Sequence, residues 1–172
     1  MPVNVFANFE DGLEPSARQR DHFITDLDFD DERLWVPYGE TAWFQPCRFD
    51  VTTGGFTAIL KALPGTVVPK HYHVSTVQGW TLQGSWRYRE HDWVATAGSF
   101  IFEPAGESHT LVIPEDATEP AIILFVVSGA LIYTDDDGNF AAYEDGFTML
   151  ELARAHYREQ GLDVSRLDAL IR

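Results

Sequence analysis

Short apolar or alternating runs, each ended by turn residues, repeat along most of the chain. Within most runs apolar and polar side chains alternate, which is typical of a β-strand with one buried face. Glycine and proline stand between nearly all of them and mark turns. The runs cover residues 56–63, 66–73, 79–89, 99–103, 109–113 and 121–127. Short strands at this spacing predict an antiparallel, all-β sandwich or small barrel.

The period of the pattern changes after Asp145. Leu150, Ala153 and Tyr157 recur at the spacing of one helix face. Gly161 stands where such a helix would end. We therefore expect a C-terminal helix that covers one end of the β structure. The expected segments are an N-terminal extension over 1–33, a β barrel over 34–146 and a C-terminal helical segment over 147–172.

Charge and composition exclude several classes of partner. With 172 residues, of which 45% are hydrophobic, the chain fits one folded domain with a sizeable core. Lysine and arginine number 12 against 27 aspartates and glutamates, which leaves a net charge of −15. Such a field repels phosphate backbones and anionic lipid headgroups, so we expect no nucleic-acid and no membrane partner.

Three further features favour a cytoplasmic location. The longest apolar run, residues 121–133, is interrupted by Ser128 and Gly129 and is shorter than the roughly 18 residues of a membrane span. The N-terminus lacks the basic and apolar parts of a secretory signal. Cys47 is the single cysteine, so no internal disulfide can form.

Candidate chemistry begins with two histidines in the segment PGTVVPKHYHVSTVQGW. In a strand His71 and His73 point to the same face, where two imidazoles can hold one metal ion. An HxH pair alone is weak evidence, since chance supplies it often. A third histidine, His109, follows in GSFIFEPAGESHTLVI, and the turn at Pro104 can bring its strand close to the first.

The spacing within these two segments resembles the two motifs of the cupin superfamily, G(X)5HXH and G(X)5PXG(X)2H. All fixed positions match: Gly65, His71, His73, Gly98, Pro104, Gly106 and His109. The resemblance implies a double-stranded β-helix, or jelly-roll barrel, with His71, His73 and His109 as metal ligands.

One expected ligand is absent. The cupin pattern usually has a glutamate three or four residues beyond the second histidine, where this chain has Val77 and Gln78, and Ile113 replaces the asparagine that often ends the second motif. Three neutral imidazole ligands do not reduce the +2 charge of a divalent ion, and they leave some of its coordination positions open. Such an ion suits a bidentate anionic oxygen ligand. This favours Fe(II), while Zn, Ni and Mn stay possible.

Two further side chains are candidates for the site. Gln78 shares the parity of Trp80, Trp86 and Tyr88, so we expect it to point inward as a hydrogen-bonding group, or else to be an incidental residue at a strand entry. Glu103 comes six residues before His109 and could hold a ligand imidazole through its free N–H, or be a surface acid.

Aromatic side chains follow the same strands. We expect them to form an apolar interior, either as plain core or as the wall of a pocket for an aryl ketone. They are Trp80, Trp86, Tyr88, Trp93, Phe100 and Phe102.

Residues 34 to 165 as a whole look like the 2,4'-dihydroxyacetophenone dioxygenase group of small cupins and the related acetylacetone dioxygenases. The similar segments are LWVPYGETAWFQPCRFD, FEPAGESHT and GALIYTDDDGNFAAYEDGFTMLELARAHYREQGLD. This resemblance implies a non-haem Fe(II) enzyme that uses O2 to cleave a C–C bond of an α-hydroxyketone or β-diketone. It also implies Glu103 as the acid supporting the three histidines, and a homodimer or homotetramer.

Two other functions stay open at this point. A cupin with Zn, Mn or Ni could be an isomerase or hydrolase that needs no O2. A cupin could also sense a metal or ligand without catalysis, attached to a regulator of transcription.

Overall fold

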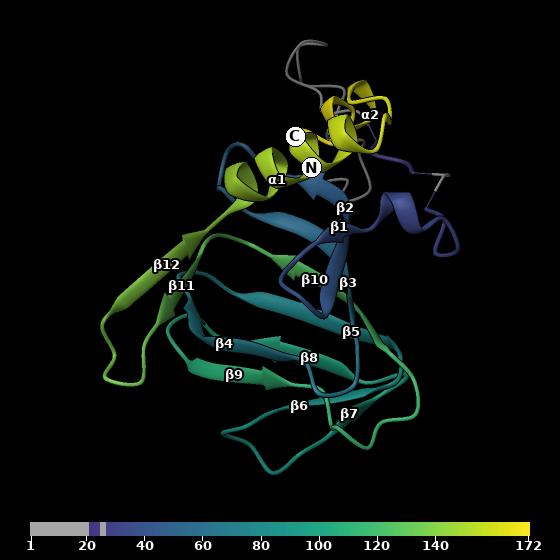
Figure 1. The fold of residues 1–172 in the computed structure, drawn as a ribbon. Coiled ribbons are helices and arrows are strands. Elements are labelled where there is room, and N and C mark those ends of the chain that lie inside the picture. The colour runs from purple at the N-terminus through teal and green to yellow at the C-terminus, as the bar shows by residue number, and fades with distance from the viewer. Residues whose placement is uncertain (1–20, 25–26) are drawn as a thin grey trace, which may run out of the picture.

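A computed structural model describes residues 21–24 and 27–172 (Figure 1). Most of the expected N-terminal extension, residues 1–33, therefore lies outside the described residues. The elements are η3 (Glu32–Leu34), β1 (Val36–Pro37), β2 (Ala42–Phe49), β3 (Phe56–Ala62), β4 (Val67–His73), β5 (Val77–Gln83), β6 (Ser85–Tyr88), β7 (Ala95–Thr96), β8 (Phe100–Glu103), β9 (Ser108–Val112), β10 (Ala121–Val127), β11 (Leu131–Thr134), β12 (Phe140–Glu144), α1 (Gly146–Glu159) and α2 (Ser165–Asp168).

Two antiparallel sheets face each other and form the jelly-roll barrel that the sequence predicted (Figure 1). Their strand orders are β1-β2-β3-β10-β5-β8 and β12-β11-β4-β9-β6-β7. Consecutive strands repeatedly change sheet, as in a double-stranded β-helix. The all-β prediction, with a helix at the C-terminal end, is confirmed.

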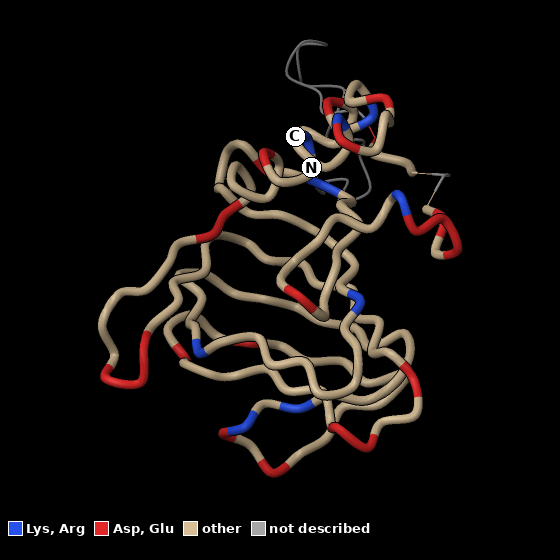
Figure 2. Tube along the Cα trace, viewed as in Figure 1, with Lys and Arg blue, Asp and Glu red and all other residues tan. Residues whose placement is uncertain are grey.

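Two clusters of buried apolar side chains make up most of the core. One cluster, which includes Phe44, Val127 and Met149, lies toward α1. A second cluster, which includes Trp86 and Ile123, lies nearer β6 and β7. Acidic residues lie mostly in the loops at the edges of the sheets (Figure 2), so the strong negative charge is carried outside this core. Within the described part of the chain no helix has the length and apolarity to cross a bilayer.

Helix α1 covers one end of the barrel, as predicted. The Asp145 side chain accepts hydrogen bonds from the backbone N–H groups of Phe147 and Thr148, and the Thr148 hydroxyl bonds back to the Asp145 N–H. This capping box determines where the helix begins. Leu150 and Ala153 are among the residues it buries against the sheets.

The run 79–89 is two strands rather than one. Gly84 has a φ of 71°, and a Cβ there would lie 2.7 Å from the Pro120 carbonyl oxygen, so only glycine fits the break. The break moves the chain from one sheet to the other and shifts the inward positions by one residue. Before it Trp80 faces outward, and after it Trp86 faces inward.

The expected aromatic interior is therefore wrong in part. Trp86 and Tyr88 are buried, whereas Trp80 and Trp93 are each 37% exposed. The two phenylalanines of β8 are also exposed, because β8 is an edge strand and their side chains lie on its outer face. The Trp80 and Phe100 rings contact each other there, with centroids 4.9 Å apart.

Candidate metal centre

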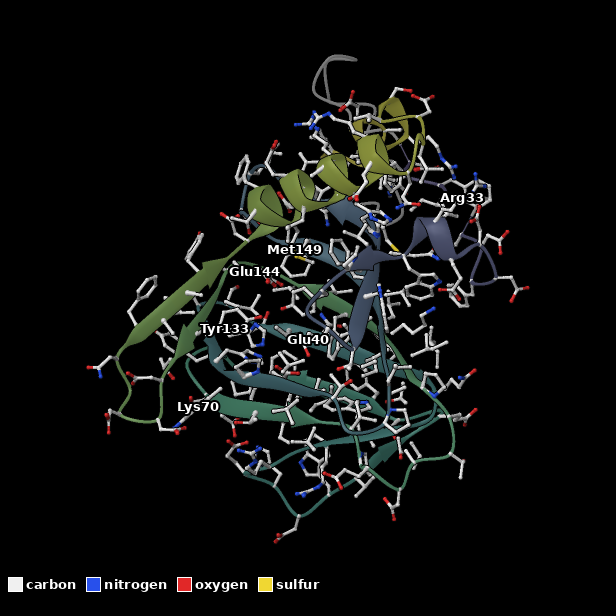
Figure 3. All side chains as sticks on the ribbon, in the orientation of Figure 1. Arg33, Glu40, Lys70, Tyr133, Glu144 and Met149 are labelled. Carbon is white, nitrogen blue, oxygen red and sulfur yellow. The ribbon has the colours of Figure 1, made fainter. Side chains whose placement is uncertain are left out.

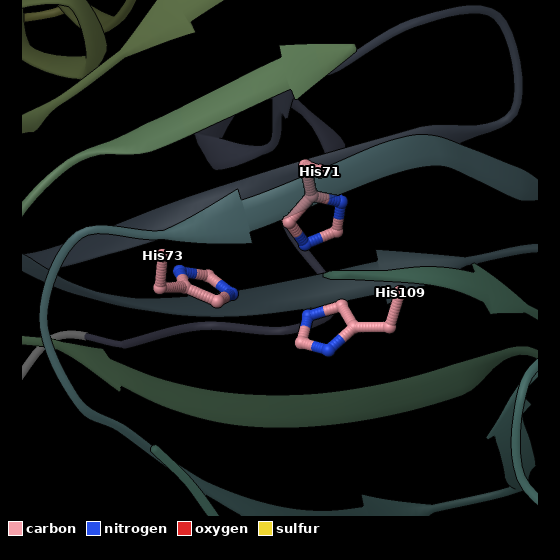
Figure 4. Close-up of side chains that lie close together, drawn as sticks. All are labelled: His71, His73 and His109. Carbon is pink, nitrogen blue, oxygen red and sulfur yellow. The ribbon is translucent and has the colours of Figure 1, made fainter. Parts of the chain in front are cut away.

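Three histidines meet inside the barrel on two neighbouring strands. His71 and His73 lie two residues apart on β4, and β9 places His109 directly opposite His71 in the antiparallel register. One ring nitrogen from each lies within 4.8 Å of the others, and the rings point toward one another (Figure 4). All three side chains are buried. The structure thus brings together the three residues that the motif spacing singled out.

The ring of His71 has a defined tautomer. Its Nδ1 lies 2.8 Å from the Pro69 carbonyl oxygen, and because a carbonyl only accepts, Nδ1 must carry the proton. Nε2 then keeps its lone pair, which is the form in which histidine binds a metal.

Burial also keeps two of the three rings neutral. Desolvation lowers the pKa of His71 to about 3, with the neighbouring His73 and His109 adding to the shift. Desolvation likewise lowers the pKa of His109. At neutral pH these two rings are therefore uncharged and need lose no proton to bind a cation.

Glu103 reaches the same centre from β8. Its Oε2 lies 3.2 Å from His73 Nε2 and 3.4 Å from His109 Nε2, while the Tyr88 hydroxyl donates to Oε1 at 2.5 Å. Burial alone would raise the pKa of Glu103, but hydrogen bonds from His73 and Tyr88 outweigh it and the pKa is lowered. Glu103 pairs directly with Val77 in the register of β5 and β8. The carboxylate that the cupin pattern usually has near the position of Val77 is therefore present here on the neighbouring strand.

The position of Glu103 refines the expected contact. The carboxylate contacts Nε2, at the tip of both rings, rather than the Nδ1 atoms nearer the backbone. The carboxylate is therefore placed to accept a hydrogen bond or a proton beside the histidine cluster. The sequence could not show whether Glu103 would contact Nδ1 or Nε2 of a ligand ring.

Two buried histidine nitrogens at the centre lack hydrogen-bond partners among the described residues. They are His73 Nδ1 and His109 Nε2. Leaving such groups unpaired in the interior is costly. A divalent cation between the rings would give an unpaired histidine nitrogen a partner and would balance the negative charge of the Glu103 carboxylate. These residues therefore fit a metal ion.

An interior cavity of about 70 Å³ lies beside the histidines. Its polar lining residues are Tyr38, His71, His73, Tyr88 and Glu144. The remaining wall is apolar and includes Phe44, Phe56, Val77, Phe125, Leu131 and Met149. Because one water needs only ~15 Å³ of such space, the cavity can admit a small organic molecule.

Gln78 does not face this cavity. Val77 lines it, and neighbouring residues of a strand point to opposite faces, so Gln78 lies on the outer face, half-buried between Phe102 and Val126. The expectation that Gln78 points inward is wrong, because it took its parity from residues beyond the break at Gly84.

Glu144 and Tyr38 are cavity residues that the sequence did not indicate. Glu144 ends β12, a strand whose other residues are exposed, so alternation gives no sign of its burial. It is buried because the chain turns into α1 at the next residue and closes over the end of the barrel.

The sequence matches the family model described as the ChrR cupin-like domain over residues 27–132. No curated protein matches the chain.

Solved structures share the fold. An RmlC-like cupin protein from Ralstonia eutropha JMP134 is 34% identical, with 75% of this chain and 84% of that chain covered and a TM-score of 0.72. A second protein from the same organism, with a cupin-like fold and unknown function, is 28% identical over 71% of this chain and 76% of that chain, with a TM-score of 0.69. An acetylacetone dioxygenase from Acinetobacter johnsonii is 19% identical over 81% of this chain and 97% of that chain, with a TM-score of 0.66, and this likeness concerns the fold.

Proposed function

Because this chain belongs to the ChrR cupin-like domain family, we propose that His71, His73 and His109 hold a divalent metal ion in a catalytic centre. We propose that the ion is Fe(II) and that the protein is a dioxygenase cleaving a C–C bond of an α-hydroxyketone or β-diketone, such as a 2,4'-dihydroxyacetophenone-like compound. The observation that carries this is a buried three-histidine cluster beside an apolar cavity.

Bound Fe(II) would supply Lewis-acid activation of the ketone and electrons for O2. The protein groups around it have separate tasks. The Pro69 carbonyl orients the ring of His71, and the Tyr88 hydroxyl holds Glu103 against His73. Glu103 can accept a proton or a hydrogen bond from a ligand oxygen at the centre.

The cavity favours a small, uncharged substrate. Its wall is apolar apart from a few side chains, and apolar walls exclude water from reactive species. A neutral ketone can enter without the cost of burying a charge. The A. johnsonii acetylacetone dioxygenase, which has the same fold, supports this substrate class.

Anaerobic purification, followed by metal analysis and an oxygen electrode, tests the proposal. We expect about one iron per chain and one O2 consumed per ketone cleaved, with hydroxyacetophenones and β-diketones as the panel. The matched control is the same protein loaded with Zn(II), which has no electron to give and should consume no O2.

Stoichiometric iron without O2 uptake on any of these ketones would contradict the dioxygenase. Ketone turnover without O2 would instead indicate an isomerase or hydrolase. Metal binding with no turnover and recovery of a sigma factor in a pull-down would indicate a sensor.

We also propose that copies of the chain associate through the outer face of β5 and β8. Trp80, Leu82, Phe100 and Phe102 are exposed together there, beside an unpaired strand edge. Exposed apolar patches of this kind mark interaction sites. Light scattering should give the mass of a homodimer or homotetramer, and Phe100→Asp should lower it; a monomeric wild type would refute the association.

A further inference from the structure

Two members of a hydrogen-bonded group of three side chains, Tyr38 and Glu144, line the interior cavity, and the third, Tyr133, lies beside them. Tyr38 follows β1. Tyr133 lies on β11 and Glu144 ends β12 (Figure 3). The Tyr38 hydroxyl donates to Glu144 Oε1 at 3.0 Å and is also hydrogen-bonded to the Tyr133 hydroxyl. We call these residues the Tyr–Tyr–Glu cluster.

The strand register connects this cluster to the histidines. Leu131 of β11 pairs with His73 on one side and with Glu144 on the other. Tyr133 pairs with His71, and their ring centroids are 5.3 Å apart. Among the described residues that line the interior cavity, Glu144 is the one carboxylate.

The same cluster borders solvent on its other side. Tyr38, Tyr133 and Glu144 also line an outer groove of about 480 Å³, together with Glu40 and Ala141. Tyr38 and Glu144 line both spaces, so the cluster lies between the cavity and the groove. A proton that leaves the cavity can reach solvent through these hydroxyl and carboxyl groups.

The environment of Glu144 suits a group that exchanges protons near neutrality. Burial raises the pKa of Glu144 to about 7, hydrogen bonds from Tyr38 and Tyr133 oppose the rise, and the charge of Asp145 adds to it. The other titratable groups lining the cavity are His71, His73 and Tyr88. A base with a pKa near the working pH is the most effective one.

We propose that Glu144 is the general base that takes the acidic proton of a ketone bound in the interior cavity, oriented and connected to the outer groove by Tyr38 and Tyr133. This rests on the proposed function. In the step a C–H or O–H bond of the substrate breaks, its proton forms an O–H bond with the Glu144 carboxylate, and the electron pair stays on the substrate as an enolate. No oxidant is needed for this transfer.

Anaerobic ionisation of acetylacetone by the metal-reconstituted full chain tests the base. The enolate absorbs in the ultraviolet, so stopped-flow absorbance follows its formation in the protein. At pH 7 we expect Glu144→Gln to slow it by about 10²-fold or more, since general bases contribute ~10²–10⁴-fold. Glu40→Gln is the matched control, because Glu40 lines the outer groove but not the cavity, and it should leave the rate unchanged.

The pH profile separates a base from a purely structural residue. A base acts when deprotonated, so the wild-type rate should rise as pH increases through about 7, and Glu144→Gln should lack this rise. Tyr133→Phe removes a hydrogen bond that lowers the pKa of Glu144, so the rise should move to higher pH. A structural role would leave the midpoint in place.

The possible failures are distinguishable. A wild type that binds neither acetylacetone nor a hydroxyacetophenone overturns the proposed function and the base with it. A wild type that ionises the probe no faster than Glu144→Gln overturns the base alone. If Glu144→Gln does not fold, an unshifted profile in Tyr133→Phe overturns it.

Discussion

Replacing Trp86 with alanine is expected to lower the free energy of unfolding by about 3–5 kcal/mol, the range for a buried aromatic side chain removed from a core. Trp86 is fully buried, and its Nε1 donates to the Thr81 hydroxyl at 2.8 Å. Its ring packs against Tyr88, Trp93 and Phe125. Chemical denaturation of the metal-free protein measures the change.

Trp80→Ala is the matched control. The same residue type is removed from the preceding strand, β5, but this side chain is 37% exposed on the outer face. We expect a loss of at most about 1 kcal/mol. Equal losses for the two variants would contradict the break at Gly84 and the change of inward parity that it produces.

These two tryptophans also show where sequence-based prediction fails. Turn residues and alternation located the strands and the all-β class, because both are local properties. The face to which each β5 side chain points is not determined by the local pattern alone. It depends on Gly84, which ends one strand, lets the chain cross to the other sheet and sets a new register. A pattern continued through Gly84 therefore gave Gln78 and Trp80 the wrong face.

The three histidines were predictable for a different reason. Their spacing to glycine and proline encodes the turns that bring β4 and β9 together, so the motif carries information about contacts as well as about residue types. Glu103 was found by its distance from His109 along the chain, but its pairing with Val77 was not. That pairing depends on the register of β5 and β8.

The contact of Glu144 with Tyr38 and Tyr133 could not be predicted from the sequence. Tyr38 and Tyr133 lie 95 residues apart, and no spacing rule connects them. Their contact with Glu144 exists because β12 continues into a helix that closes the barrel. Residues of this kind become visible only when the packing of distant segments is known.

Metal retention by His109→Ala tests the central claim most directly. Wild type should keep about one divalent ion per chain after dialysis against a weak chelator, as measured by mass spectrometry of the metal. Removing a residue that supports a metal ligand already costs ~10–100-fold in affinity, so losing a ligand should cost at least about 100-fold and leave the variant nearly empty.

The control for this measurement is His156→Ala. His156 lies on α1, where its Nε2 is 2.9 Å from the Arg33 carbonyl oxygen, and it does not belong to the histidine cluster. The account predicts one ion per chain in wild type and in His156→Ala, and almost none in folded His109→Ala. Full occupancy with unchanged affinity in His109→Ala would contradict it.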